Sequence, residues 1–303
     1  MNAKWISQVT SSATLRQCLE ELAGEGKIDL PRLAMLTPME LSDICGVEEN
    51  IAENAIRKAR QLAGYQPIQR VSKGAKTDTI PTGVKEFDEK TPWGGLPKYK
   101  IHLFAGKYGT GKSILAMQIA ASAIALNYKP VFYIDTENAF NEKMMDALTR
   151  RFVGKPLDDV LDQDFVVIKT ADVFALTETI KYEIPPEVRL IVVDSIIEPF
   201  RAQFRGREKL ASRQQWLHYL VDLLRRRTLA GATVILTNQV SARPELLGEE
   251  DAPAGGNILL HTANTIWRMR RRGQDGGYIE ALDVPGLARG TRYNYTIRDD
   301  GLY

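Results

Sequence analysis

The sequence predicts an α/β fold with a mostly parallel sheet, preceded by a small all-α domain. Short, nearly continuous apolar strands alternate with helical segments from Pro81 onward, a pattern typical of a parallel sheet covered on both faces. A glycine-rich loop joins one of these strands to a helix, and the residues before Gly64 show only helical periodicity. We therefore expect a helical domain over residues 1–64, a linker over 65–80 and an α/β core over 81–303.

The first 64 residues carry the signals of short helices. One amphipathic face has leucines at helical spacing: Leu15, Leu19 and Leu22. Thr37, Pro38 and Glu40 predict a helix start with a capping box. A turn at 44–47 then leads into a helix over 50–62. Two interpretations stay open: a helix-hairpin-helix, whose turn offers backbone N–H groups to nucleic-acid phosphates, or a plain helix–turn–helix packing unit.

Composition indicates a globular protein outside the membrane. The chain has 303 residues, of which 44% are hydrophobic, and no apolar run approaches the roughly 20 residues that a membrane span needs. Residues 1–12 lack the apolar segment of a signal peptide. We expect a cytoplasmic location and no membrane partner. The net charge of +2 excludes no class of partner by itself.

The two cysteines, Cys18 and Cys45, both lie near the N-terminus and lack metal-ligand spacing. Because disulfides are rare in the cytosol, we expect a reduced, buried pair.

Four apolar segments predict the strands of the core sheet. They cover residues 131–135, 165–168, 190–194 and 233–237. A further apolar strand, 101–105, precedes the glycine-rich loop, and the segment from Tyr278 to Leu302 is expected to be β-rich, with turns at Gly286 and Gly301.

The glycine-rich loop matches the pattern G-x-x-x-x-G-K-[ST] of a P-loop. It comprises Gly106, Lys107, Tyr108, Gly109, Thr110, Gly111, Lys112 and Ser113. A strand, such a loop and a helix together form a cradle of backbone N–H groups for phosphates. Lys112 is expected to reach the β- and γ-phosphates of ATP, and Ser113 to hold Mg²⁺.

Polar residues follow three of the predicted strands, and parallel strands bring such ends to one edge of a sheet. Asp194 fits a carboxylate that binds Mg²⁺ or its waters, or else a strand-end acid that caps a loop. Glu137 is the candidate to orient and deprotonate the attacking water, or else an acid at a helix start. Gln239 is the candidate γ-phosphate sensor, because an amide both donates and accepts; structural capping is the alternative.

Two segments after these strands suit a nucleic-acid backbone. The segment 200–209 is cationic, and its candidate phosphate contacts are Arg201, Arg205, Arg207 and Lys209. The segment 240–257 is long, polar and rich in Gly and Pro, with Arg243, Gly255 and Gly256 as its candidates. Solvated surface loops are the alternative for both segments. The run Arg268–Arg272 adds positive charge, but a strand with one solvated face has the same pattern.

From about Leu15 to Leu302 the chain resembles the archaeal RadA recombinases, RecA-like proteins that carry out homologous strand exchange. The motifs that carry the resemblance are Gly106–Ser113, Ile134–Glu137, Val193–Ser195, Phe200–Ala202, Gly206–Arg207, Arg213–Gln215, Asn238–Val240 and Gly255–Ile258 with His261. The resemblance implies a RecA-like P-loop ATPase core behind a helix-hairpin-helix domain. It implies a DNA-dependent ATPase in recombinational DNA repair that uses ATP and Mg²⁺.

The resemblance also implies roles for residues at subunit interfaces. His261 corresponds to a histidine that reads the γ-phosphate across an interface, and Asp283 and Pro285 to a segment that caps a neighbour's ATP. The segments 201–209 and 240–257 correspond to the two DNA-binding loops. The implied partners are single-stranded and double-stranded DNA and further copies of the chain, in a filament or ring, in an archaeal cytoplasm near the nucleoid.

The sequence departs from this family pattern at three places. Residues 9–12 lack the glycines usual in the first hairpin, Lys107 stands where the family usually has an acid, and the linker lacks the family's phenylalanine and alanine spaced three apart. Tyr65 is a poor substitute for that docking motif. Two functions stay open on these grounds: a divergent recombinase, or a paralog that uses ATP as a switch and assists the main recombinase without exchanging strands. A ring-forming RecA-like ATPase is a third, weaker alternative.

Overall fold

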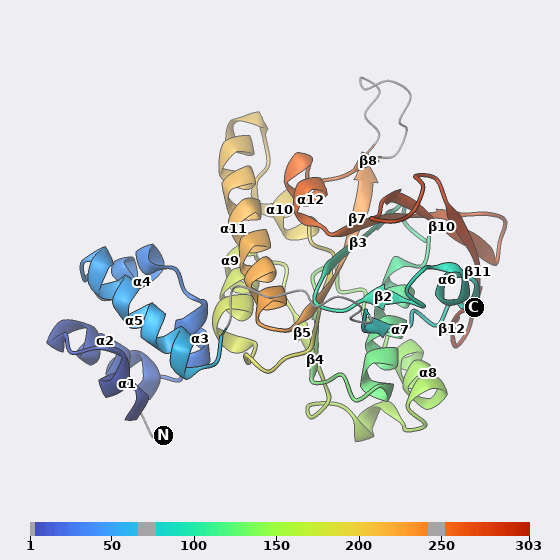
Figure 1. The fold of residues 1–303 in the computed structure, drawn as a ribbon. Helices are drawn as coiled ribbons and strands as arrows, with labels where there is room; N and C mark the ends of the chain where they lie inside the picture. Colours follow the sequence, from blue (N-terminus) through green and yellow to red (C-terminus); the bar gives the residue numbers. More distant parts are fainter. Residues whose placement is uncertain (1–3, 66–76, 242–251) are drawn as a thin grey trace. The chain divides into compact units, whose positions relative to one another are not determined.

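The computed structural model describes residues 4–65, 77–241 and 252–303, and Figure 1 shows the chain as a ribbon. The chain divides into two compact units. One comprises Met1–Lys73 with Glu178–Pro186, and the other comprises Gly74–Thr177 with Glu187–Tyr303. Among the described helices, none is long and apolar enough to cross a membrane.

The N-terminal unit is helical, as predicted. Its helices are α1 (Lys4–Val9), α2 (Ala13–Gly24), α3 (Leu30–Met35), α4 (Pro38–Cys45) and α5 (Glu49–Leu62). The capping box at the start of α4 is present: Thr37 Oγ1 accepts from the Glu40 N–H at 3.2 Å, and Glu40 Oε2 accepts from the Thr37 N–H at 2.8 Å. Leu15 and Leu19 of α2 are fully buried in a core that also contains Leu41 of α4, so these helices are held by apolar packing.

The turn between α4 and α5 uses its own backbone donors. Gly46 has a left-handed φ of 62°, which glycine adopts at little cost. The N–H groups of Gly46 and Val47 both donate to the Ser42 carbonyl, at 2.8 Å and 3.3 Å. These two donors therefore have an acceptor within the chain, and both interpretations of the turn stay open.

The expectation of a reduced, buried cysteine pair is wrong. A disulfide joins Cys18 in α2 to Cys45 in α4, with 5.6 Å between the two Cα atoms, and both residues are only half-buried. The sequence argument used the redox compartment and not geometry, and packing of α2 against α4 brings the two side chains within bonding distance.

The larger unit is built on a mostly parallel sheet, as predicted. Within the described residues this sheet has ten strands in the order β12-β11-β10-β9-β3-β7-β6-β4-β5, with β8 paired to β7. The parallel strands are β3 (Ile101–Gly106), β4 (Val131–Asp135), β5 (Phe165–Lys169), β6 (Leu190–Asp194), β7 (Thr233–Ser241) and β9 (Thr265–Arg271). The antiparallel strands are β8 (Ala252–Pro253), β10 (Gly276–Asp283), β11 (Arg292–Arg298) and β12 (Gly301–Leu302). A separate two-stranded sheet pairs β1 (Thr79–Ile80) with β2 (Leu96–Pro97).

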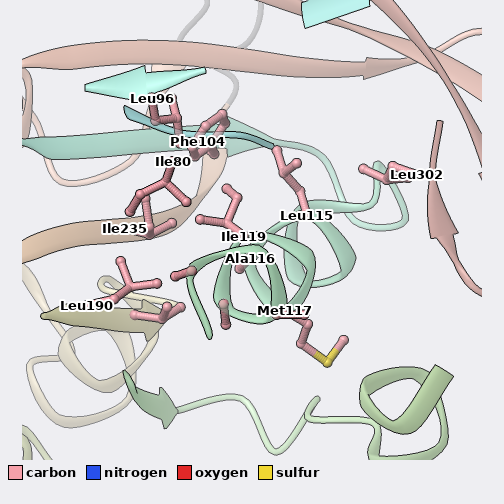
Figure 2. Close-up of a cluster of buried hydrophobic side chains, with 14 of the residues drawn as sticks. Ile80, Leu96, Phe104, Leu115, Ala116, Met117, Ile119, Leu190, Ile235 and Leu302 are labelled. Atoms are coloured by element: carbon pink, nitrogen blue, oxygen red, sulfur yellow. The ribbon is translucent and has the colours of Figure 1, made fainter. Parts of the chain in front are cut away.

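Helices accompany this sheet. They are α6 (Lys85–Lys90), α7 (Lys112–Ala125), α8 (Glu142–Phe152), α9 (Val173–Glu178), α10 (Glu198–Gln203), α11 (Leu210–Leu229) and α12 (Asn257–Thr262), with short 3₁₀ turns η1 (Leu157–Asp159) and η3 (Arg207–Lys209). The π-helical turn η2 (Thr179–Glu183) falls in the N-terminal unit. Figure 2 shows α7 against side chains of neighbouring strands, among them Phe104, Leu190 and Ile235. The alternate strand residues, such as Ile191 and Leu236, are also buried. Burial of both faces explains why these strands read as continuous apolar runs.

Candidate functional site

The polar strand ends meet at one edge of the core sheet. Strands β3, β7, β6 and β4 are consecutive neighbours in the sheet and run parallel. The glycine-rich loop begins at the end of β3, and Glu137 follows the end of β4 by two residues. Asp194 is the last residue of β6, and Gln239 lies two residues before the end of β7. The sheet order thus brings together residues that lie about a hundred positions apart in the sequence, as the parallel pattern predicted.

The glycine-rich loop joins β3 to α7, in the predicted strand–loop–helix context. A Cβ atom on Gly106 would lie 2.6 Å from the Met269 carbonyl oxygen of the neighbouring strand β9, and Gly111 has a φ of 88°. Both positions therefore require glycine. The buried Tyr295 hydroxyl of β11 donates to the Thr110 carbonyl at 2.6 Å, a support that no sequence pattern indicated.

Lys112 begins α7 and lies within the electrostatic range of two of the predicted acids. Its Nζ donates to the Lys107 carbonyl of the same loop at 3.0 Å. Burial lowers the pKa of Lys112, and the carboxylates of Asp194 and Glu137 oppose that shift. A cation held half-buried at the start of a helix, beside backbone N–H groups, suits the phosphates of a nucleotide.

Asp194 is buried, with 2% of its surface exposed. Its Oδ2 accepts from the Tyr133 hydroxyl at 2.6 Å, and its Oδ1 accepts from the Thr237 hydroxyl. Burial, and then the nearby Asp194 carboxylate, raise the pKa of Tyr133, so Tyr133 keeps the proton that it donates. Sequence reasoning missed Tyr133 and Thr237, which lie on β4 and β7, the two strands that flank β6.

The donor set around Asp194 fits Mg²⁺ that arrives with a nucleotide. In the described ranges, no group of three or more His, Cys, Asp or Glu side chains could hold a metal ion by itself. Mg²⁺ is usually bound by one or two protein oxygens together with phosphate oxygens and waters. Asp194 and the Ser113 hydroxyl are the residues that would supply the protein oxygens.

Glu137 lies in a turn that a second buried carboxylate organises. Asp135, with 1% of its surface exposed, accepts from the backbone N–H groups of Glu137, Ala139 and Phe140 at 3.2, 3.0 and 3.0 Å. Three backbone donors on one carboxylate fix the turn after β4. Asp135 was quoted within a motif but was not predicted to position Glu137.

Glu137, Gln239 and Arg201 form one chain of hydrogen bonds. The Gln239 amide nitrogen donates to Glu137 Oε1 at 3.1 Å, and Arg201 Nη1 donates to the Gln239 amide oxygen at 2.9 Å. Arg201 was predicted as a DNA contact. The structure also connects it to the strand-end residues.

The first cationic segment is partly helical. Arg201 lies in α10 and Lys209 in η3, and Pro199 at the start of α10 suits a first helical turn. Arg201, Arg205 and Lys209 are exposed. The backbone of Arg207 lies in η3, and its side chain is outside the description.

The second segment is shorter than predicted at both ends. β7 continues to Ser241 and pairs with β8, Ala252–Pro253. Arg243 lies outside the described residues. Gly255 and Gly256 form the turn before α12, where Gly255 has a left-handed φ of 98°, a conformation that favours glycine.

The residues expected at subunit interfaces are exposed, and Asp283 lies apart from the strand ends. His261 is exposed on α12. Asp283 and Pro285 are exposed at the end of β10 and just after it. Asp283 pairs with Ile266, near the start of β9, whereas Gly106 pairs with Met269, near its end. Asp283 therefore lies toward the opposite edge of the sheet from the glycine-rich loop of its own chain.

The arginine run 268–272 lies mostly on β9, next to the glycine-rich loop. Arg268 donates to the buried Glu280 carboxylate at 2.9 and 2.7 Å, so this arginine is structural. Beside it is a cavity of about 330 Å³, whose lining includes Lys107, Tyr108, Arg270 and Arg271.

A family model described as Rad51 matches residues 74–303, which cover the whole sheet and every polar strand end described above. The chain belongs to the Rad51 family. The Rad51 family comprises RecA-like recombinases, and membership supports a role in DNA repair, an ATPase activity and the use of ATP and Mg²⁺. The resemblance read from the sequence is thus confirmed at the level of the Rad51 family.

Proposed function

We propose that the protein is a DNA-stimulated ATPase that assembles on single-stranded DNA and promotes homologous pairing and strand exchange. The observation that carries the proposal is the hydrogen-bonded series of Glu137, Gln239 and Arg201 beside Lys112 and Asp194. It links residues suited to ATP hydrolysis with the cationic segment suited to DNA phosphates.

The residues divide the work of hydrolysis. Bound Mg²⁺ would neutralise charge on the β- and γ-phosphate oxygens. Ser113 and Asp194 would hold it, and Lys112 and the loop N–H groups would hold the phosphates. Glu137 orients a water and accepts its proton as the water oxygen bonds to the γ-phosphorus and the bond to ADP breaks.

DNA binding rests on the two segments that follow β6 and β7. Arg201, Arg205, Arg207 and Lys209, with Arg243 and the Gly255–Gly256 turn, are the proposed contacts. The exposed His261, Asp283 and Pro285 are proposed to act on a neighbouring copy's nucleotide, which is supported by the distance of Asp283 from its own glycine-rich loop. Contacts of this head-to-tail kind build filaments when they do not close into rings.

A second candidate is a paralog that assists the main recombinase and exchanges no strands. The absence of the linker's phenylalanine and alanine motif favours it. So does Tyr65, which packs on the N-terminal helical core and stacks against Arg60 at 5.6 Å, because a side chain used within its own domain is less suited to dock onto another copy.

Two measurements with the full chain test these candidates. Electron microscopy with ATP and single-stranded DNA should show helical filaments for a recombinase, and short or no assemblies for a mediator. In parallel, Glu137→Gln should lower DNA-stimulated phosphate release by about 10²- to 10⁴-fold, while a fluorescent ATP analogue still binds. Hydrolysis by Glu137→Gln at the parental rate would show that Glu137 is not the base.

A further inference from the structure

Arg201 makes a contact that a simple DNA-binding residue does not need. Its guanidinium donates to the Gln239 amide oxygen at 2.9 Å. An amide has an acceptor end and a donor end, so a cation at the oxygen end turns the nitrogen end the other way. That nitrogen donates to Glu137 Oε1 at 3.1 Å. Arg201 therefore fixes which end of Gln239 faces Glu137.

The orientation of Gln239 bears on the accessibility of the Glu137 carboxylate. The Gln239 amide nitrogen occupies Oε1 at 3.1 Å, so this oxygen is less accessible to the hydrogen of an attacking water. With Gln239 held in this way, Glu137 has one oxygen fewer with which to accept a proton.

The contact of Arg201 is open to competition. Arg201 is exposed on α10, in the cationic segment that also contains Arg205 and Lys209. A phosphate oxygen carries negative charge and binds a guanidinium more strongly than a neutral amide oxygen does. A DNA backbone on this segment would draw the guanidinium away from Gln239.

We propose that Arg201 is a positioning residue that, in the absence of DNA, holds the Gln239 amide against Glu137 and thereby restrains ATP hydrolysis. When DNA phosphates bind Arg201, its hydrogen bond to Gln239 is lost, Gln239 is free to reorient, and Glu137 becomes available as a base. This inference rests on the proposed function, and it adds a route by which DNA binding raises the rate.

The first test compares hydrolysis without DNA in four variants of the full chain: Arg201→Ala, Gln239→Ala, the double variant, and Arg150→Ala as control. Arg150 is an exposed arginine on α8 that pairs with Asp146 at 2.7 Å. We expect Arg201→Ala to raise DNA-free kcat by about tenfold or more, the effect of losing one hydrogen bond to a charged group, with KM for ATP unchanged. Saturating DNA should then stimulate this variant less than the parent. Arg150→Ala should match the parent, and Arg201→Ala should add nothing in the Gln239→Ala background.

The second test needs no nucleotide. In ¹⁵N-glutamine-labelled protein, the side-chain amide signal of Gln239 is identified by its loss in Gln239→Ala. We expect Arg201→Ala to shift this signal, oligo-dT to shift it in the parent, and Arg150→Ala to leave it in place. The role of Arg201 would be overturned by an unmoved Gln239 signal, or by a DNA-free rate of Arg201→Ala at or below that of the parent. In either case, DNA-stimulated hydrolysis by the parent would still support the proposed function. A parent that hydrolyses no ATP with or without DNA would overturn both.

Discussion

Two buried carboxylates in the core sheet differ in how their charge is balanced. Glu280 of β10 is 3% exposed and meets two cations: Arg268 at 2.7 Å and Arg292 at 3.1 Å. Burial raises its pKa, but the two arginines outweigh burial and hold the pKa of Glu280 below its usual range. Asp194 of β6 is 2% exposed, and its hydrogen-bond partners are the neutral hydroxyls of Tyr133 and Thr237.

This difference separates a structural carboxylate from one available to a ligand. The charge of Glu280 is used within the fold to join β9, β10 and β11. The hydroxyls orient Asp194 without cancelling its charge, and Lys112 is a cation within its electrostatic range. A divalent cation bound together with phosphates would add positive charge beside Asp194.

The largest expected effect is the loss of ATP hydrolysis in Asp194→Asn, which tests whether Asp194 is functional. The substitution keeps the shape and removes the charge, so Mg²⁺-dependent hydrolysis should fall by at least about 100-fold, while the folded state persists. Phosphate release and scanning calorimetry on the same sample measure the two effects. Hydrolysis within about threefold of the parent would show that Asp194 is no more functional than Glu280.

Glu280→Gln is expected to lower stability and to leave ATP hydrolysis unchanged. Removing one partner leaves Arg268, whose side chain is only 18% exposed, without its carboxylate, and breaking a buried pair costs about 3 kcal/mol. Arg292 is 58% exposed and should contribute little. Urea unfolding should record the lost stability, and ATP hydrolysis per folded molecule should stay at the parental level. A loss of hydrolysis without a loss of stability would reverse the assignment of the two carboxylates.

The smallest expected effect is that of pH on stability through His102, a third buried group of the core sheet. It is fully buried in β3, where one ring nitrogen contacts the Thr265 hydroxyl at 2.7 Å and the other contacts the Pro97 carbonyl at 2.8 Å. Burial lowers the pKa of His102 to about 4. His102 is therefore protonated below about pH 6.5 in the unfolded chain, but only below about pH 4 in the folded chain.

The contribution of neutral His102 to the free energy of unfolding is fully present above about pH 6.5. It is lost as the pH falls toward 4, by up to about 3 kcal/mol. Urea unfolding at several pH values should show this slope, and His102→Gln should flatten it. An equal slope in both proteins would mean that other groups control the acid response.

Much of the site was predictable because its signals are local. The P-loop needs glycines, a lysine and a hydroxyl within eight positions, and continuous apolar strands ending in Asp194, Glu137 and Gln239 predict where those side chains lie. The supporting hydroxyls of Tyr133, Thr237 and Tyr295 were missed because each lies on a different strand from the group that it supports, and only the sheet order brings the two together.

By itself, the sequence determined the α/β core with its parallel strands, the phosphate loop and the resemblance to a recombinase family, because strand periodicity and loop chemistry are written in neighbouring residues. Only the tertiary structure decided that Cys18 bonds Cys45, that Arg268 belongs to Glu280, and that Arg201 contacts Gln239. Each of these depends on which segments pack side by side, and residues far apart in the chain meet only after the sheet and helices have assembled.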